Sequence, residues 1–227
     1  MVRIILVRHG QTQWNVERRF RGRTDVKLDQ TGIRQAKATA KRLNHLKLNA
    51  IYSSPLGRAF DTARIIAQPR KFKVEPVEGF IDIDFGGWQG LSLEEVEDQY
   101  LSLYQLWLSS PQKVRFPGGE GLDEVRERAV AALDGLLARH KNGTVLVVTH
   151  RVVNKVLICA ILGLDNSHFW QIRQDTGAIN IFGYRNRFIP LEAPKECCSH
   201  IMPRMGFVVV RLNDTSHLGN DRADVDF

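Results

Sequence analysis

Short apolar runs alternate along the chain with longer segments in which apolar residues recur every three or four positions. The apolar runs predict strands near residues 3–8, 50–53, 73–77, 144–149, 178–183 and 206–212. The helical spacing predicts helices near residues 31–46, 57–68, 91–108, 122–140 and 151–162. Because strands that alternate with helices form mostly parallel sheets covered on both faces, we expect an α/β fold, a three-layer α/β/α sandwich with a mostly parallel central sheet.

The length of 227 residues suits one such domain. We assign it to residues 1–218 and expect residues 219–227 to form a loose tail. The segment from Arg185 to Met205 is rich in proline and charge, and we expect it to be a long irregular connection. The three cysteines suggest no disulfide framework, and we see neither a signal peptide nor an apolar run of about 20 residues. We therefore expect a soluble, cytoplasmic protein without a membrane partner.

Two of the apolar runs end in a histidine. His9 comes shortly after the run Ile4–Val7, and His150 follows the run 144–149. Because ligands bind beyond the carboxyl ends of parallel strands, we expect both imidazoles at one edge of the sheet. Arg58 lies in the first turn of the helix that follows the strand near 50–53, so it can face the same edge.

The residues beside His9 add binding chemistry to this edge. Arg8 supplies a positive charge, and Gly10 is expected to let the backbone turn and approach a ligand closely. Thr12 and Asn15 follow as neutral hydrogen-bonding groups. This pattern predicts a phosphate site with a histidine nucleophile.

Five motifs extend the pattern along the chain. They are R-H-G-Q-T-x-W-N at Arg8–Asn15, S-S-P-L-x-R-A-x-x-T-A at Ser53–Ala63, F-G-x-W-x-G at Phe85–Gly90, P-G-G-E at Pro117–Glu120 and V-x-V-V-T-H at Val145–His150. In order and spacing they resemble the phosphoglycerate-mutase-like branch of the histidine phosphatase superfamily. The resemblance extends from Val2 to about Leu218 and looks closest to the metal-independent phosphoserine phosphatases of that branch.

The resemblance implies a role for each matching residue. His9 would become phosphorylated, an acid near Phe85 would protonate the leaving oxygen, and the phosphate pocket would be lined by Arg8, Arg58, Asn15 and His150. Residues 107–119 would form a flap that brings Glu120 towards the substrate. Weaker candidates for the leaving-group pocket are Trp14, Phe20, Trp88 and His217. Core packing is the alternative for Phe20 and Trp88. A homodimer is plausible by family analogy.

The physical chemistry of phosphoryl transfer agrees with these roles. The transferred group spreads negative charge over its equatorial oxygens, and two arginine forks with a second histidine can stabilise that charge. Nearby arginines disfavour a protonated His9, so its pKa should be lowered towards the nucleophilic neutral form. We expect one ring nitrogen of His9 to donate to a backbone carbonyl, which would aim the other at phosphorus.

The proton donor departs from the family pattern, because Asp82 stands where a glutamate is usual. Aspartate is shorter by one methylene. The loop must therefore sit closer, a water must intervene, or Asp84 must serve instead. Asp82 is the favoured donor, although an engineered substitution would leave the same residue here.

Two further departures add positive charge. Arg151 stands where glycine is common, and Arg21 stands where a glutamine often precedes the glycine that corresponds to Gly22. Arg21, Gly22 and Arg151 are candidate substrate contacts. The two arginines indicate a substrate with a second anionic group, such as a carboxylate, or else they are solvated side chains without substrate contact.

The formal net charge is +7, and it is concentrated in residues 1–80, which hold 17 Lys and Arg against 6 Asp and Glu. Such a field attracts phosphate esters. It would also suit nucleic acid, but the arginines flank the R-H-G motif, so we expect a small-molecule phosphate ester and no nucleic acid. The remaining histidines lack metal-ligand spacing, so we expect metal-independent chemistry without a cofactor.

The sequence therefore predicts a metal-independent phosphomonoesterase that acts through a phosphohistidine. Phosphoserine, phosphoglycerate and sugar phosphates are the candidate substrates. A cofactor-dependent phosphoglycerate mutase is the alternative within the family. A catalytically weak phospho-ligand-binding protein is the alternative of a different class.

Overall fold

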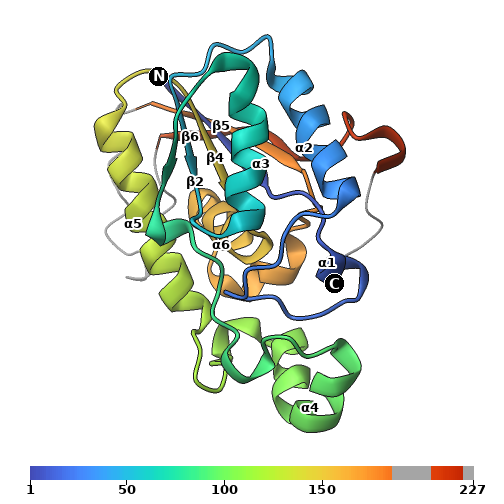
Figure 1. Ribbon diagram of the computed structural model, residues 1–227. Coiled ribbons are helices and arrows are strands. Elements are labelled where there is room, and N and C mark those ends of the chain that lie inside the picture. Colours follow the sequence, from blue (N-terminus) through green and yellow to red (C-terminus); the bar gives the residue numbers. More distant parts are fainter. Residues whose placement is uncertain (186–205, 222–227) are drawn as a thin grey trace, which may run out of the picture.

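The computed structural model describes residues 1–185 and 206–221 and has a six-stranded sheet at its centre (Figure 1). Its strands, in the spatial order β3-β2-β4-β1-β5-β6, are β1 (Val2–Arg8), β2 (Ala50–Ser53), β3 (Val74–Pro76), β4 (Gly143–Thr149), β5 (Ile179–Tyr184) and β6 (Phe207–Asp214). The first four strands in that order run parallel, whereas β5 pairs antiparallel with both β1 and β6. The expected mostly parallel sheet is confirmed.

Helices cover both faces of the sheet. α2 (Gln30–Leu43) and α3 (Gly57–Ala67) pack on one face, and α5 (Leu122–Arg139) and α6 (Arg151–Leu162) pack on the other. The side chains of β1 alternate between the two cores, with Ile5 and Val7 on the α2 side and Ile4 and Leu6 on the α5 side. All four are fully buried, which stabilises the fold by about 1.5–3 kcal/mol for each side chain. The three-layer sandwich is confirmed.

Side-chain caps set where two of the helices begin. Asp29 accepts a hydrogen bond from the Gly32 amide at 2.7 Å, so α2 begins at Gln30. Ser92 and Glu95 form a reciprocal capping box, so α4 (Leu93–Ser109) begins two residues later than the predicted position near 91. These caps satisfy amide groups that have no partner inside the helix.

Helix α4 lies at the lower end of the molecule, away from the sheet (Figure 1). It contains a break at Tyr100, whose backbone angles are non-helical (φ −137°, ψ 34°). The sequence predicts one continuous helix here, because the apolar spacing runs across the break and neither proline nor glycine marks it. Beyond the break, Tyr104 and Trp107 are buried and face the functional site described below.

The C-terminal residues differ from expectation where the structure describes them. Residues 219–227 were expected to be loose, but Gly219–Asp221 form a 3-10 turn. The turn is held because the Asp221 carboxylate pairs with Arg34 at 2.8 Å and its carbonyl accepts from Gln35 at 2.7 Å. Residues 222–227 and the expected irregular connection after Arg185 lie outside the described residues. Among the helices that are described, none has the length and apolar character needed to cross a membrane.

Candidate active site

Two histidines lie side by side where the central strands end. Strands β1 and β4 are parallel and in register, with Arg8 opposite Thr149, so both strands end at the same edge of the sheet. The His9 amide donates to the Thr149 carbonyl at 2.9 Å. The ring centroids of His9 and His150 are 5.2 Å apart, and both side chains are buried. The strand pattern therefore predicted their juxtaposition.

The ring of His9 is held in one orientation. Its Nδ1 lies 2.7 Å from the Gly10 carbonyl oxygen, which can only accept, so Nδ1 carries the proton and Nε2 has a free lone pair. Burial lowers the pKa of His9 well below its ordinary value, and the charges of Arg58 and Arg8 lower it further. The imidazole is therefore neutral, with Nε2 available as a nucleophile.

Gly10 lies where the loop after His9 meets α2. A Cβ atom there would lie 2.4 Å from the Gly32 carbonyl oxygen in the first turn of α2. The Gly10 amide also donates to Thr62 Oγ1 at 3.1 Å. The absence of a side chain thus lets the loop after His9 pack directly against α2.

Arg58 reaches the same edge from the first turn of α3 and is fully buried. Its two terminal nitrogens donate to the carbonyls of Thr24 (2.8 Å) and Gly22 (2.6 Å) and to Asp82 Oδ2 (2.9 Å). Its Nε makes no hydrogen bond within residues 1–185 and 206–221. Because a buried donor without an acceptor is costly, this atom suits an anionic oxygen of a ligand.

His150 offers a second such atom. Ser54 Oγ accepts from the Leu56 amide at 3.3 Å and lies 2.7 Å from His150 Nε2, an arrangement that favours donation from the hydroxyl to Nε2. A neutral His150 then carries its proton on Nδ1, which is buried and has no hydrogen-bond partner among the described residues. Burial lowers the pKa of His150 well below its ordinary value, with Arg58 as the next cause, which agrees with a neutral ring.

The structure separates the two candidate acids. The carboxylate of Asp82 faces Arg58 and lies 3.5 Å from His150 Nδ1, and Asp82 lines the same pocket as His9. Asp84 instead accepts from the Gly86 amide at 2.9 Å and caps the turn that follows. Asp82 is therefore the acid that lies beside the two histidines.

The other predicted substrate contacts divide into two groups. Arg21 and Arg151 line the pocket that His9 opens into. Thr12 and Asn15 lie outside its lining, and Asn15 Oδ1 accepts from both the amide and the hydroxyl of Thr12 at 2.9 Å, which caps the short helix α1 (Gln13–Val16). Gly22 also lies outside it. Its positive φ of +51° turns the chain so that its carbonyl accepts from Arg58.

Glu120 lies outside the pocket lining as well. Its carboxylate accepts from Arg23 (2.9 Å), from two nitrogens of Arg128 (2.9 and 3.0 Å) and from the Asp84 amide (3.0 Å). Side-chain exposure of Glu120 is 17%. The flap residues thus bring Glu120 to the loop that carries Asp82, where protein donors already occupy its oxygens.

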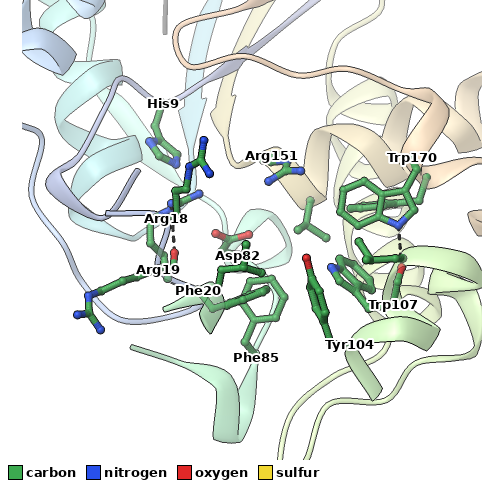
Figure 2. Close-up of a pocket in the computed structure, with 15 residues that line it drawn as sticks. His9, Arg18, Arg19, Phe20, Asp82, Phe85, Tyr104, Trp107, Arg151 and Trp170 are labelled. Atoms are coloured by element: carbon green, nitrogen blue, oxygen red, sulfur yellow. Dashed lines mark hydrogen bonds between the residues drawn. The ribbon is translucent and has the colours of Figure 1, made fainter. Parts of the chain in front are cut away.

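The pocket beyond His9 combines charge with aromatic surface (Figure 2). The aromatic side chains are Phe20, Phe85, Tyr104, Trp107, Phe169 and Trp170, and the charged ones besides Asp82 are Arg18, Arg19, Arg21 and Arg151. The guanidinium of Arg151 lies 5.4 Å from the centre of the Trp170 ring, and Trp170 Nε1 donates to the Trp107 carbonyl at 2.7 Å. Phe20 lines this pocket, whereas Trp88 is fully buried and packs against Phe20 and Phe116.

The sequence pattern that defines the histidine phosphatase superfamily (branch 1) matches residues 4–194, most of the chain. The protein belongs to this superfamily. The family expected from the five motifs is thereby confirmed, and so is the expectation of a phosphatase enzyme.

Relatives of this histidine phosphatase include phosphoserine phosphatase 1 from Hydrogenobacter thermophilus, 37% identical over 219 residues, which cover 96% of this chain and 95% of the relative. YhfR from Bacillus stearothermophilus has a similar structure, with a TM-score of 0.85, 30% identity and coverage of 96% of this chain and 100% of that chain. A mutant phosphoserine phosphatase from Entamoeba histolytica, solved with phosphoserine, superposes with a TM-score of 0.80 at 28% identity, and the match covers 96% of this chain and 100% of that chain.

Sequence reasoning about this histidine phosphatase missed several residues of the site. Ser54 was part of a quoted motif but received no role, although its place directly after a strand was a usable signal. Arg18 and Arg19 line the pocket but were read only as part of a basic region. The contribution of α4 through Tyr104 and Trp107 carried no signal, because aromatic residues on a helix usually indicate core packing.

Proposed function

We propose that this enzyme hydrolyses small phosphate monoesters through a phosphohistidine on His9. The observation that carries the proposal is the arrangement of buried nitrogen atoms around His9. The imidazole is neutral and oriented by Gly10, and the nearby Arg58 Nε and His150 Nδ1 are buried without hydrogen bonds among the described residues. A phosphoryl group would supply the oxygen acceptors that both atoms require.

In the first step His9 Nε2 gives its lone pair to phosphorus. The bond between phosphorus and the ester oxygen breaks, its electron pair stays on that oxygen, and Asp82 in its protonated form supplies a proton to it. Arg8, Arg58 and His150 stabilise the charge on the phosphoryl oxygens. The products are an alcohol, a phosphorylated His9 and the Asp82 carboxylate.

In the second step the oxygen of a water molecule attacks the phosphorus of phosphorylated His9 and forms a bond to it. The Asp82 carboxylate takes a proton from the water, the bond between nitrogen and phosphorus breaks, and its electron pair returns to Nε2. Inorganic phosphate leaves, and both side chains regain their starting forms. Hydrolysis, rather than transfer to a second metabolite, is the outcome that the phosphatases among the relatives support.

The substrate that we favour carries a second anionic group. Arg21 and Arg151 both line the pocket beyond His9, as do Arg18 and Arg19. The relatives named above as phosphoserine phosphatases, one of them solved with phosphoserine, support a carboxylate-bearing ester. Phosphoserine is therefore the first candidate, followed by phosphoglycerate and then by sugar phosphates, which lack the carboxylate.

The test is phosphate release in excess EDTA from phosphoserine, 3-phosphoglycerate, a sugar phosphate and 4-nitrophenyl phosphate. Wild-type protein should release many equivalents, and His9→Ala should release none. His140→Ala is the matched control, because His140 bonds the Tyr52 hydroxyl at 2.9 Å and does not line the pocket. Release by His9→Ala at the wild-type rate would refute the phosphohistidine. Binding of esters without release would indicate a phospho-ligand-binding protein, and phosphoryl exchange between phosphoglycerates would indicate a mutase.

A further inference from the structure

The loop that carries Asp82 is tied to helix α5 by one guanidinium group. Arg128 Nη1 donates to the carbonyl oxygens of Gly79 (3.1 Å) and Ile81 (2.6 Å), and its Nη2 donates to the carbonyl oxygen of Asp82 (3.0 Å). The guanidinium is planar and rigid. Its fork therefore fixes these backbone oxygens relative to one another and to α5.

Glu120 holds that guanidinium in place. Arg128 Nε donates to Glu120 Oε1 at 3.0 Å and Nη2 donates to Oε2 at 2.9 Å, which is a bidentate pair. Glu120 Oε2 also accepts from the Asp84 amide at 3.0 Å. Arg128 and Glu120 thus bind the backbone on both sides of the Asp82 side chain, at the Ile81 carbonyl and at the Asp84 amide. Side-chain exposure is only 21% for Arg128 and 17% for Glu120, so solvent screens this contact less than it screens a surface ion pair.

The position of this backbone matters because of the length of the acid. Asp82 is shorter than the glutamate that the family pattern places there, so the reach of its carboxyl group depends directly on where the loop lies. We propose that Arg128 is a positioning residue, held by Glu120, which sets the reach of the Asp82 carboxyl group to the leaving oxygen. This inference rests on the proton transfer from Asp82 to the ester oxygen described above. A misplacement of about 1 Å at such a site can cost about 100-fold in rate.

The leaving group distinguishes positioning of the acid from a purely structural role. An alkyl ester such as phosphoserine needs a proton on its departing oxygen, whereas the 4-nitrophenolate of 4-nitrophenyl phosphate departs without one. General acid catalysis contributes about 10²- to 10⁴-fold. We therefore expect Arg128→Lys to lower kcat/KM for the alkyl ester by about 100-fold or more. The kcat/KM for 4-nitrophenyl phosphate covers only the steps up to phosphorylation of His9, and it should fall by less than about threefold because departure of 4-nitrophenolate draws little on the acid.

The quantity to measure is the ratio of the two kcat/KM values, because that ratio excludes the hydrolysis of phosphorylated His9 and does not depend on how much of a variant is folded. Arg139→Lys is the matched control on the same helix. Arg139 donates to Glu75 and to the Tyr52 hydroxyl, each at 3.2 Å, and does not line the pocket. Its ratio should equal that of the wild type. In an Asp82→Asn background, Arg128→Lys should add no further loss on the alkyl ester, because the proton donor is already gone.

Three results would overturn the inference. Equal losses on both esters would mean that Arg128 acts on the phosphate site or on stability alone. An unchanged ratio in Arg128→Lys would mean that the loop keeps its position without the guanidinium. An additive loss in the Asp82→Asn background would mean that Arg128 acts independently of the acid. Absence of turnover on both esters in the wild type, by contrast, would refute the proposed function and this inference with it.

Discussion

Replacement of Arg58 by lysine tests the anion site directly. The guanidinium is fully buried and donates three hydrogen bonds, to Thr24, Gly22 and Asp82, while Nε has no acceptor among the described residues. In the transition state we expect Nε and one terminal nitrogen to donate to phosphoryl oxygens. Lysine keeps the positive charge but has a single nitrogen, so it cannot reproduce this fork.

The expected loss follows from those two hydrogen bonds. Charged hydrogen bonds contribute about 1.5–3 kcal/mol each, so the pair is worth about 3–6 kcal/mol. At about 1.4 kcal/mol for each tenfold change in rate, Arg58→Lys should lower kcat/KM by about 10²- to 10⁴-fold. A loss of this size should appear with 4-nitrophenyl phosphate as well, because Arg58 binds the transferred group. Phosphoserine should lose at least as much, because Arg58 also holds the Asp82 carboxylate.

The assay is steady-state hydrolysis with both esters, accompanied by urea unfolding. Arg70→Lys provides the control, because Arg70 also donates to two backbone carbonyls, those of Ile66 and Leu43, but lies away from the pocket. It should lose stability and keep its activity. A folded Arg58→Lys protein with kcat/KM within tenfold of the wild type would refute the anion site built around Arg58.

Four further predictions concern the nucleophile, the pH dependence of stability, the packing of the loop after His9 and the substrate. Because burial lowers the pKa of His9, kcat for 4-nitrophenyl phosphate should stay constant as the pH falls to about 6.5, the ordinary pKa of histidine, and should decline only at lower pH. A decline of kcat centred at or above pH ~6.5 would contradict a neutral nucleophile. The pKa values of His9 and His150 are both lowered by folding, so below about pH 6.5 the unfolded chain binds protons that the folded chain does not. The free energy of unfolding, measured with urea, should therefore be highest above about pH 6.5 and fall as the pH drops below it. A free energy of unfolding that did not change there would contradict both pKa shifts. Gly10→Ala should destabilise the fold by about 1–3 kcal/mol, because the new Cβ would lie 2.4 Å from the Gly32 carbonyl oxygen. The control Gly135→Ala, in α5 with open space around it, should stabilise the fold by about 0.5–1 kcal/mol. Equal unfolding midpoints for the two variants would contradict the packing argument. Arg151→Met should raise KM for phosphoserine about tenfold, which corresponds to the loss of one charged hydrogen bond, and should leave KM for 4-nitrophenyl phosphate unchanged. An equal rise of KM for both esters would argue against a second anionic group on the substrate.

The layers of the fold were predictable because each central element repeats one simple pattern. β1 and β4 are continuous apolar runs, as expected of strands buried on both faces, and this pattern alone predicts that His9 and His150 lie at one edge. Element ends were less predictable, since they depend on local caps. α2 ends at Leu43 rather than near residue 46, and Ser92 delays the start of α4.

The support of the site was not predictable from the sequence. Arg128 lies on an amphipathic helix and 46 residues from the carbonyl of Asp82, so its sequence context is that of a solvated side chain. Glu120 belongs to a motif, and motif membership indicated substrate contact because no sequence pattern records which donors a carboxylate meets in the fold. Arg18 adopts a positive φ of 54°, which only the three-dimensional path of the loop after α1 requires.

The shorter acid can be understood from these contacts together. An aspartate at position 82 is compatible with catalysis in three ways. The loop can lie closer to the substrate, a water can lie between the acid and the leaving oxygen, or Asp84 can serve instead. Asp84 caps a turn, which favours Asp82 as the donor. Arg128 ties the carbonyls of Gly79, Ile81 and Asp82 to α5, while Arg58 holds the Asp82 carboxylate from α3. Two arginines on different layers therefore fix both the backbone and the side chain of Asp82, which favours the closer loop over a mobile one that reaches its substrate through water.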